Sequence, residues 1–416
     1  MEYLKLLTVV GISLAVPPLA LAAPDLFSPA NNRGHFDQPG ELLRNVAADP
    51  ANERIEIVAV DPSTVSSRSE ALRVSLPGGL AFDVRRTEFA TMESGNQVWT
   101  GRIEVGSSRG PVLQRLIPLD HLDNQVIAVR SGDTVLANIR VGGELFRLVP
   151  IERGAHALVE VDQSKFLPDE TEKAYEEMVM ASGGKVDFGP DPGPKAISTI
   201  RVLVAFGPAS AAAIGNEQQA VDLAFAEANN ALAATNTDAR LQQAGTIQFY
   251  NQSESSNYST MLARLTNLSD GFYDAIGSQR NSVAADLVAY FAPVSAGLCG
   301  QAAGIATPSA NAYFVMNPQC VSGNWTFVHE AGHVVGARHD NDPTVTPFAY
   351  GHGFVMTSIS RRTVMAVNNG PCAACTRFGA FSAPNYTVSG VPIGTANFND
   401  NTRVWRTRGP TVAAFR

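Results

Sequence analysis

Short runs that alternate between apolar and polar residues follow one another from about residue 71 to residue 161. A period of two residues predicts strands with one buried face. The clearest runs are residues 72–76, 80–84, 126–129, 135–141 and 145–149. Pro77-Gly78-Gly79 separates the first two runs and predicts a hairpin. Residues 24–70 are polar and follow no clear period, so we expect an irregular segment before this β-rich unit.

The period changes further along the chain. Residues 169–181 have the composition of an acidic helix, and residues 183–195 hold so many glycines and prolines that we expect an exposed linker. Beyond the linker the pattern predicts a strand, a helix, two strands and a second helix, at residues 200–206, 216–234, 286–291, 312–316 and 324–335. This order predicts a separate domain of the α/β class.

The first residues have the organisation of a signal peptide. Lys5 precedes an apolar run that ends in Ala20-Leu21-Ala22, the small-x-small pattern that signal peptidases cut. A membrane helix is the alternative, but the run is short and Pro17-Pro18 would break a spanning helix. We expect residues 1–22 to be removed, with cleavage after Ala22 or Ala23, and the protein to be secreted, either extracellular or periplasmic in transit. No later segment is predicted to span a membrane stably.

Composition and charge narrow the class of partner. The 416 residues leave room for two or three domains, and a hydrophobic content of 45% is enough for full-sized cores. The net charge of −8 and the pI near 5.4 argue against nucleic acid as a partner. We expect a monomer.

One stretch carries the chemistry, and it reads His-Glu-Ala-Gly-His-Val-Val-Gly-Ala-Arg-His-Asp from residue 329. His329 and His333 are four residues apart, so both imidazoles project from one face of a helix. Gly336 lets the chain turn out of that helix and bring His339 back as a third nitrogen ligand. Three protein ligands with an open fourth position are typical of catalytic Zn²⁺. Glu330 lies beside the metal, where a general base would act on a zinc-activated water.

This spacing resembles that of the metzincin metalloproteases, in which a methionine turn follows the zinc motif. The candidate here is Met365, which the resemblance places as an apolar floor under the metal. The third histidine is followed by Asp340, and in this the chain resembles the reprolysin-like branch of the metzincins. Val367 stands where other branches carry a tyrosine. More narrowly, the chain looks like the peptidyl-Asp metalloendopeptidases, a secreted bacterial group. The matching stretches are residues 199–204, 297–300, 329–340, 351–354, 381–384 and 411–416.

The resemblance implies an α/β metzincin catalytic domain over residues 196–416, with a twisted mixed sheet and an active-site helix. It implies one catalytic Zn²⁺, protein or peptide substrates, and cleavage before Asp or Glu. Residues 23–195 then read as a β-rich propeptide that inhibits the enzyme and is removed near Ala196. Residues 1–298 contain no cysteine, so a thiol cannot block the metal. A carboxylate such as Asp83 or Asp120, a steric block, and a folding role without metal contact all remain open.

The cysteines predict two disulfides. Cys299, Cys320, Cys372 and Cys375 all lie in the C-terminal half, and an even number is typical of exported chains. Of the three connectivities we expect Cys299–Cys320 and Cys372–Cys375, because each pair flanks a short loop. A redox role for Cys372 and Cys375 is disfavoured, since they do not open a helix after a strand.

Cleavage before an acidic residue requires a cation in the subsite just past the scissile bond. Arg377 follows the methionine turn and is the candidate, with Arg361 and Arg362 nearby. For each of these arginines a solvated surface position is the alternative. The substrate itself is expected to lie extended along an edge strand near residues 297–307.

Other functions and sites are less well supported by the residues. A secreted non-catalytic zinc-binding or toxin-like protein is the alternative function, but such a protein has no use for Glu330. We expect His352 to pack a loop and Asp340 to buttress the turn after His339. Residues 397–401 fit a turn better than a calcium site.

Overall fold

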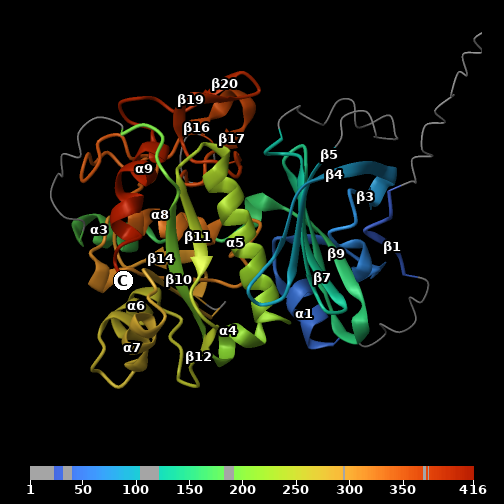
Figure 1. The fold of residues 1–416 in the computed structure, drawn as a ribbon, viewed down its shortest axis with the longest axis horizontal. Helices are drawn as coiled ribbons and strands as arrows, with labels where there is room; N and C mark the ends of the chain where they lie inside the picture. The colour runs from blue at the N-terminus through green and yellow to red at the C-terminus, as the bar shows by residue number, and fades with distance from the viewer. Residues whose placement is uncertain are drawn as a thin grey trace, which may run out of the picture.

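The computed structural model of this chain describes residues 23–30, 40–103, 121–181, 192–293, 296–368, 372 and 374–416, and the statements below concern that part. Figure 1 shows two regions side by side, a sheet built from residues 23–161 and a C-terminal region built from residues 192–416. Residues 167–181, called the strap from here on, leave the sheet and run along the C-terminal region. The helix of the strap, α3 (Glu172–Ala181), lies on the side of the C-terminal region away from the sheet (Figure 1).

The N-terminal sheet has nine antiparallel strands in the order β1-β2-β9-β8-β7-β6-β5-β4-β3. Its strands are β1 (Phe27–Pro29), β2 (Asn52–Val60), β3 (Ala71–Leu76), β4 (Leu80–Thr91), β5 (Gln97–Ile103), β6 (Gln125–Ser131), β7 (Thr134–Val141), β8 (Glu144–Pro150) and β9 (His156–Val161). All five predicted runs lie on these strands. The alternating side chains bury one apolar face around Phe82, Trp99 and Ile139.

The expectation of an irregular segment at residues 24–70 is wrong. That stretch holds β1, helix α1 (Glu41–Ala48) and β2. Val58 is the one fully buried residue of β2, and α1 has none, so neither element shows a strong apolar period. Short 3-10 helices lie at Pro62–Thr64, Pro77–Gly79, Glu152–Gly154, Gln163–Lys165, Ser309–Asn311 and Thr357–Ile359.

The C-terminal region is α/β, as expected. Its main sheet has the order β11-β10-β13-β15-β14, in which β14 is an antiparallel edge strand and the other neighbours are parallel. The strands are β10 (Ser198–Phe206), β11 (Ala239–Gln243), β12 (Gln248–Phe249), β13 (Leu287–Phe291), β14 (Gly300–Ala302) and β15 (Tyr313–Met316). The helices are α4 (Pro208–Ala212), α5 (Glu217–Ala234), α6 (Tyr258–Thr266), α7 (Ala275–Ser282), α8 (Thr326–Val335) and α9 (Asn401–Val412).

Two cores cover the two faces of this sheet. Successive residues of β10 alternate between them, with Val202 and Val204 in one core and Leu203 and Ala205 in the other. Helices α5, α8 and α9 pack on the first face, and α6 and α7 on the second. The chain after α8 adds two small sheets, one of β16 (Val355–Met356), β17 (Arg361–Arg362) and β18 (Thr376–Arg377), the other of β19 (Ala383–Val388) and β20 (Val391–Ile393).

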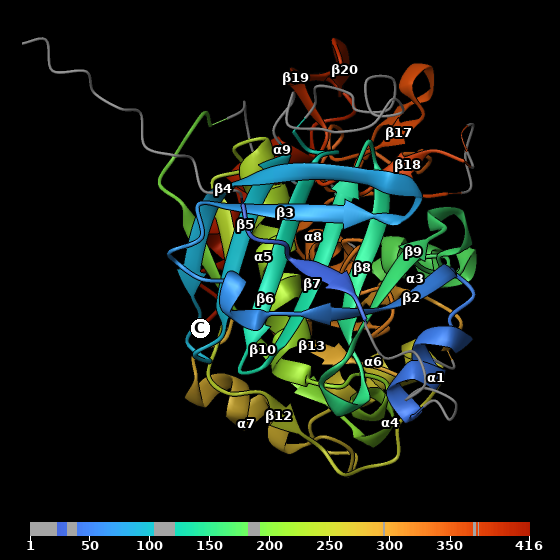
Figure 2. The same ribbon diagram turned by 90° about the vertical axis from the view of Figure 1, so that its right-hand side faces the viewer.

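Helix α5 joins the two regions. It packs on β11 within its own region and on β5, β6 and β7 of the N-terminal sheet, which spreads over it in Figure 2. The contacts to the sheet are both apolar and polar, since Leu223 packs in one cluster with Val98, Ile127 and Val129. Asp222 accepts hydrogen bonds from Ser94 (2.8 Å) and Asn96 (2.8 Å), and Glu227 accepts one from Asn138 (2.7 Å).

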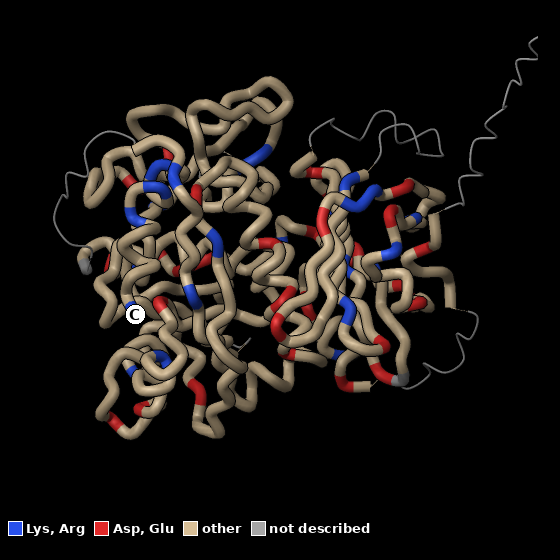
Figure 3. The backbone as a smooth tube through the Cα atoms, viewed as in Figure 1, with Lys and Arg blue, Asp and Glu red and all other residues tan. Residues whose placement is uncertain are grey.

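Lys and Arg are interspersed with Asp and Glu over both regions in Figure 3. Among the described helices, none has the length and apolar character that a bilayer-spanning segment needs. The predicted signal peptide (1–22) and residues 183–191 of the predicted linker lie outside the described residues.

Candidate metal and catalytic site

Helix α8 positions the first two histidines. It begins after Trp325, whose left-handed backbone (φ 56°) starts the turn, and it ends at Gly336. Gly336 has φ 123°, a conformation that favours glycine, and a side chain there would meet Phe348 at 2.6 Å. The chain therefore turns sharply after α8 and brings His339 back beside His333.

The three imidazoles converge on one point. Their Nε2 atoms lie 3.1 Å apart between His329 and His333, and 3.2 Å apart for each pair that includes His339. The Nδ1 atoms of the two helical histidines contact backbone oxygens. Nδ1 of His329 lies 2.9 Å from the Val364 oxygen, and Nδ1 of His333 lies 2.9 Å from the Ala337 oxygen. These contacts orient both Nε2 atoms towards the same point.

This donor set fits a tetrahedral Zn²⁺. Ligand nitrogens at roughly 2.0–2.1 Å from such an ion are about 3.3 Å from one another, close to the observed separations. Burial lowers the pKa of His333, which favours the neutral imidazole that a metal requires. Glu170 completes the group, with its carboxylate 3.1 Å from Nε2 of His333, 3.2 Å from that of His339 and 3.7 Å from that of His329.

The methionine turn lies directly beneath α8. Met365 is fully buried, and a side chain at Gly332 would meet its sulfur at 2.7 Å. The turn also orients the ligands, because Val364 contacts His329 as described above. Asp340 accepts a hydrogen bond from the backbone of Val367 (2.9 Å) and so links the chain after the third histidine to the turn. The structure thus brings together all the residues that the sequence placed around the metal.

Glu330 lies on the other side of the histidines, against the edge strand. A side chain at Gly300 would meet its Oε1 at 2.4 Å, so the carboxylate touches the backbone of β14. Neither carboxylate oxygen makes a hydrogen bond of good geometry to the described residues. Burial, and then the negative charges of Glu170 and Asp169, raise the pKa of Glu330 well above its ordinary value.

The carboxylate that reaches the histidines comes from the strap. The backbone N–H of Cys299 donates to the Pro168 oxygen (2.8 Å) and that of Gly300 donates to the Asp169 oxygen (3.2 Å). The strap therefore lies on the edge where the substrate was expected. Glu170, the next residue, places a side chain that is 1% exposed among the three imidazoles.

Asp83, one of the two aspartates proposed from the sequence, does not fill this role. Asp83 lies on β4 and pairs with Arg73 (2.7 Å), far from the histidines in the fold. Asp120 lies outside the described residues. The predicted acidic helix is shorter than expected, because α3 begins at Glu172. Asp169 and Glu170 therefore precede the helix, and their side chains point into the site rather than to solvent.

Tyr175 is a further residue that the sequence did not indicate. Its ring stacks on His339 with the ring centres 4.0 Å apart, and its hydroxyl donates to Asp342 (2.9 Å) and accepts from the backbone of His339 (3.1 Å). Arg338 pairs with the same Asp342 (2.6 Å). A lone tyrosine in an acidic helix carries no sequence signal for such a contact.

The other predicted residues are placed as follows. Arg377 is buried and pairs with Asp169, whereas Arg361 pairs with Asp123 of the N-terminal sheet (2.8 Å). The disulfides join Cys299 to Cys320 and Cys372 to Cys375, as expected. His352 stacks on Phe398 and contacts the Phe398 and Thr344 oxygens, so it packs a loop.

Known proteins resemble this chain over most of its length. Residues 197–379 match the metallo-peptidase family M12 (Reprolysin_5). A peptidyl-Asp metalloendopeptidase of Xanthomonas campestris is 35% identical over 381 residues, which cover 90% of this chain and 88% of that protein. Two proteins of the same name from strains of Stenotrophomonas maltophilia are 35% identical over 422 and 416 residues, and each alignment covers 97% of both chains. A solved structure of metalloproteinase-II from Bacteroides fragilis aligns with 73% of this chain and 87% of its own chain, at 11% identity and with a TM-score of 0.39.

Proposed function

Because the chain belongs to the reprolysin-like M12 metallopeptidases and is a zinc metalloendopeptidase, we propose that it is exported as an inactive precursor and cuts peptide bonds before acidic residues. The observation that carries the catalytic assignment is the buried carboxylate of Glu330 beside three converging histidines. The proposed latency rests on the position of the strap, and the proposed preference for acidic residues rests on Arg377.

The chemistry divides between the metal and the chain. Zn²⁺ held by His329, His333 and His339 would supply a Lewis acid for the scissile carbonyl and lower the pKa of a water molecule. Glu330 is separate from this donor set, so its carboxylate is free to accept a proton from the attacking water and return it to the leaving amine. Gly300 leaves room for the carboxylate beside the edge strand.

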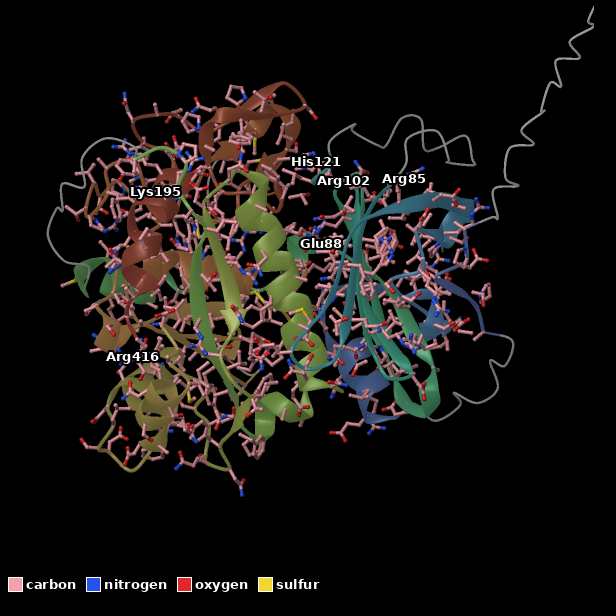
Figure 4. The ribbon with its side chains drawn as sticks, in the orientation of Figure 1. Arg85, Glu88, Arg102, His121, Lys195 and Arg416 are labelled. Atoms are coloured by element: carbon pink, nitrogen blue, oxygen red, sulfur yellow. A yellow bond between two sulfur atoms is a disulfide. The ribbon has the colours of Figure 1, made fainter. Side chains whose placement is uncertain are left out.

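The precursor form is supported by the position of the strap. Glu170 fills the side of the histidines that a substrate would need, and Tyr175 covers His339. The chain from Pro194 to Ile197 is exposed, which suits proteolytic release near Ala196. Figure 4 shows Lys195 on the side of the C-terminal region away from the strands that carry Arg85 and Arg102. A cut there would leave the N-terminal sheet and the strap held only by non-covalent contacts.

Two further parts of the proposal rest on sequence and on relatives. Export is supported by the signal-peptide pattern of residues 1–22. The acidic preference is supported by the relatives whose names describe a peptidyl-Asp endopeptidase. The alternative of a non-catalytic zinc protein is set aside, since the family is enzymatic and Glu330 is in place.

The decisive experiment compares the precursor with its processed form. Processed protein should hydrolyse casein, 1,10-phenanthroline should abolish the hydrolysis, and Zn²⁺ should restore it. Glu330→Gln should lose at least about a thousandfold in kcat while keeping one zinc per chain. Wild-type activity in Glu330→Gln would overturn the assignment of the base.

Latency is tested on the full chain. Glu170→Ala should raise casein hydrolysis by the uncut precursor by about tenfold or more, because the carboxylate that contacts the three histidines is lost. Glu172→Gln is the matched control, since this acidic side chain lies on α3 and not among the histidines. An uncut precursor that stays inactive after Glu170→Ala would contradict the role of Glu170.

A further inference from the structure

Arg377 is held in a fixed position by the C-terminal region. Its Nη1 donates to the Asn324 oxygen (3.0 Å) and its Nη2 donates to the Ala366 oxygen (3.1 Å). Asn324 immediately precedes the turn into α8, and Ala366 follows the methionine of the turn beneath it. The guanidinium is thus anchored to both segments that frame the histidines, and it is 2% exposed.

The remaining face of that guanidinium binds the strap. Asp169 accepts from Nη1 through Oδ1 (3.0 Å) and from Nη2 through Oδ2, which is a bidentate arginine–carboxylate pair. Burial disfavours the charged form of Asp169, but Arg377 and His329 outweigh burial and lower its pKa. The pair is therefore ionised, and its geometry is the one by which arginine distinguishes a carboxylate from an amide.

Two buried arginines lie side by side in this part of the C-terminal region. Arg362 is the register partner of Arg377 across β17 and β18 and is also buried. Burial, and then the charge of Arg377, lower the pKa of Arg362 to about 9. Within the described part of the C-terminal region, no carboxylate lies within ion-pair distance of Arg377. Asp340 faces Arg362 but is engaged with Val367. Removal of Asp169 would leave the buried guanidinium of Arg377 without its carboxylate partner. A carboxylate of the substrate could then take the place of Asp169.

The position of this cation relative to the histidines fits a subsite beside the scissile bond. Asp169 and Glu170 are neighbours, so their Cα atoms are about 3.8 Å apart. One of these side chains reaches the three imidazoles and the other reaches Arg377. A substrate residue bound to Arg377 would therefore be within about one residue of the bond that the enzyme cuts.

We propose that Arg377 is the residue that selects an acidic side chain next to the scissile bond, and that Asp169 occupies this same subsite before processing. The proposal rests on the proposed endopeptidase function and deepens it. The strap then blocks two places at once, with Glu170 at the histidines and Asp169 in the specificity subsite. One arginine accounts for both substrate choice and part of the latency.

The first test measures specificity in the processed enzyme. Each variant is expressed as the full chain, and its processed form is assayed on two peptides that differ only in Asp or Asn after the scissile bond. Wild type should favour Asp, and Arg377→Gln should reduce the Asp/Asn ratio of kcat/KM by about 10- to 100-fold. Arg377→Lys should retain part of the ratio, since it keeps the charge but loses the bidentate geometry.

Arg361→Gln is the matched control, because Arg361 also pairs with an aspartate of the N-terminal part but lies outside the site. It should leave the Asp/Asn ratio unchanged. Cleavage of the Asn peptide by Arg377→Gln reports that the variant is folded. An unchanged ratio in an active Arg377→Gln enzyme overturns the proposal, whereas a wild-type enzyme that cuts neither peptide overturns the endopeptidase function itself.

The second test does not depend on the folding of any variant. A peptide with the sequence of residues 165–172, Lys-Phe-Leu-Pro-Asp-Glu-Thr-Glu, should inhibit processed wild-type enzyme competitively. The Asp169→Asn form of the peptide should bind about 10- to 100-fold more weakly, while the Glu172→Gln form should bind equally well. Equal inhibition by the Asp and Asn peptides would refute the shared subsite.

Discussion

Replacing Gly300 by alanine would displace the proposed base without altering any ionisable group or any metal ligand. The added Cβ would stand 2.4 Å from Oε1 of Glu330 and 2.8 Å from its Cδ and Cγ. An ordinary contact begins at 3.4 Å, so the carboxylate must move by about 1 Å. The backbone of β14 has little freedom to give way, because it pairs with β15.

A misplacement of about 1 Å costs roughly a hundredfold in rate when geometry controls the reaction. We therefore expect kcat/KM of the processed Gly300→Ala enzyme to fall by about a hundredfold on casein or a peptide substrate. Zinc content and melting temperature should stay near those of wild type, because alanine is at least as well suited to a strand as glycine. In the Glu330→Gln background the same change should cost less than about twofold, since the base is already lost.

Gly409→Ala is the matched control. A side chain at Gly409 would meet its nearest neighbours at 3.7–3.9 Å, which is an ordinary contact, and the residue lies on α9 away from the histidines. It should keep wild-type activity. Wild-type kcat/KM in a zinc-loaded Gly300→Ala enzyme would mean that Glu330 does not act from the position that the structure gives it.

Three further outcomes follow from buried groups. Burial lowers the pKa of His156 from 6.5 to about 4, so the unfolded chain binds a proton that the native chain excludes. The free energy of unfolding should therefore fall by roughly 3 kcal/mol as the pH drops from 6.5 to 4. In denaturant titrations His156→Asn should show a weaker dependence of stability on pH than wild type, and the same dependence in both proteins would contradict this. The double change Cys299→Ser and Cys320→Ser opens a loop of sequence separation 21 and should lower the free energy of unfolding by about 3 kcal/mol, as measured by calorimetry. An unchanged free energy of unfolding would mean that the bond does not stabilise this loop. Tyr175→Ala removes the stack on His339 and should lower the opening free energy of the strap by about 2 kcal/mol in hydrogen exchange of the Glu330→Gln precursor; unchanged protection would exclude Tyr175 as a support of the strap.

Local patterns predicted the metal site well because its parts are close together in the sequence. The spacing of His329 and His333 is fixed by one helix, and the return of His339 needs only the positive φ of Gly336. Met365 is more distant, and the resemblance to a known family, rather than its own surroundings, indicated its position. Strands β3, β4, β6, β7 and β8 were predicted from their alternating runs, whereas β5 and β9 were not predicted, and β2 was missed because most of its residues are half-buried.

Long-range contacts account for what the sequence did not reveal. Gly300 and Gly332 are ordinary glycines in the sequence, and only the packed structure shows that one faces Glu330 and the other faces Met365. The same holds for Arg377, because only the fold buries this arginine and places it against Asp169.

The strap shows how functional residues can be missed when a sequence is interpreted from its local pattern alone. Asp169 and Glu170 directly precede an acidic helix, and acidic residues are favoured at helix N-termini, so the pattern alone extends the helix over them. In the fold these two side chains instead meet four buried cationic or metal-binding groups of the C-terminal region, namely Arg377, His329, His333 and His339. Burying two adjacent carboxylates is costly unless each is paired, and here each has its own partner. That pairing depends on residues more than 150 positions away, which is why composition and period could indicate an acidic segment but not its place in the active site.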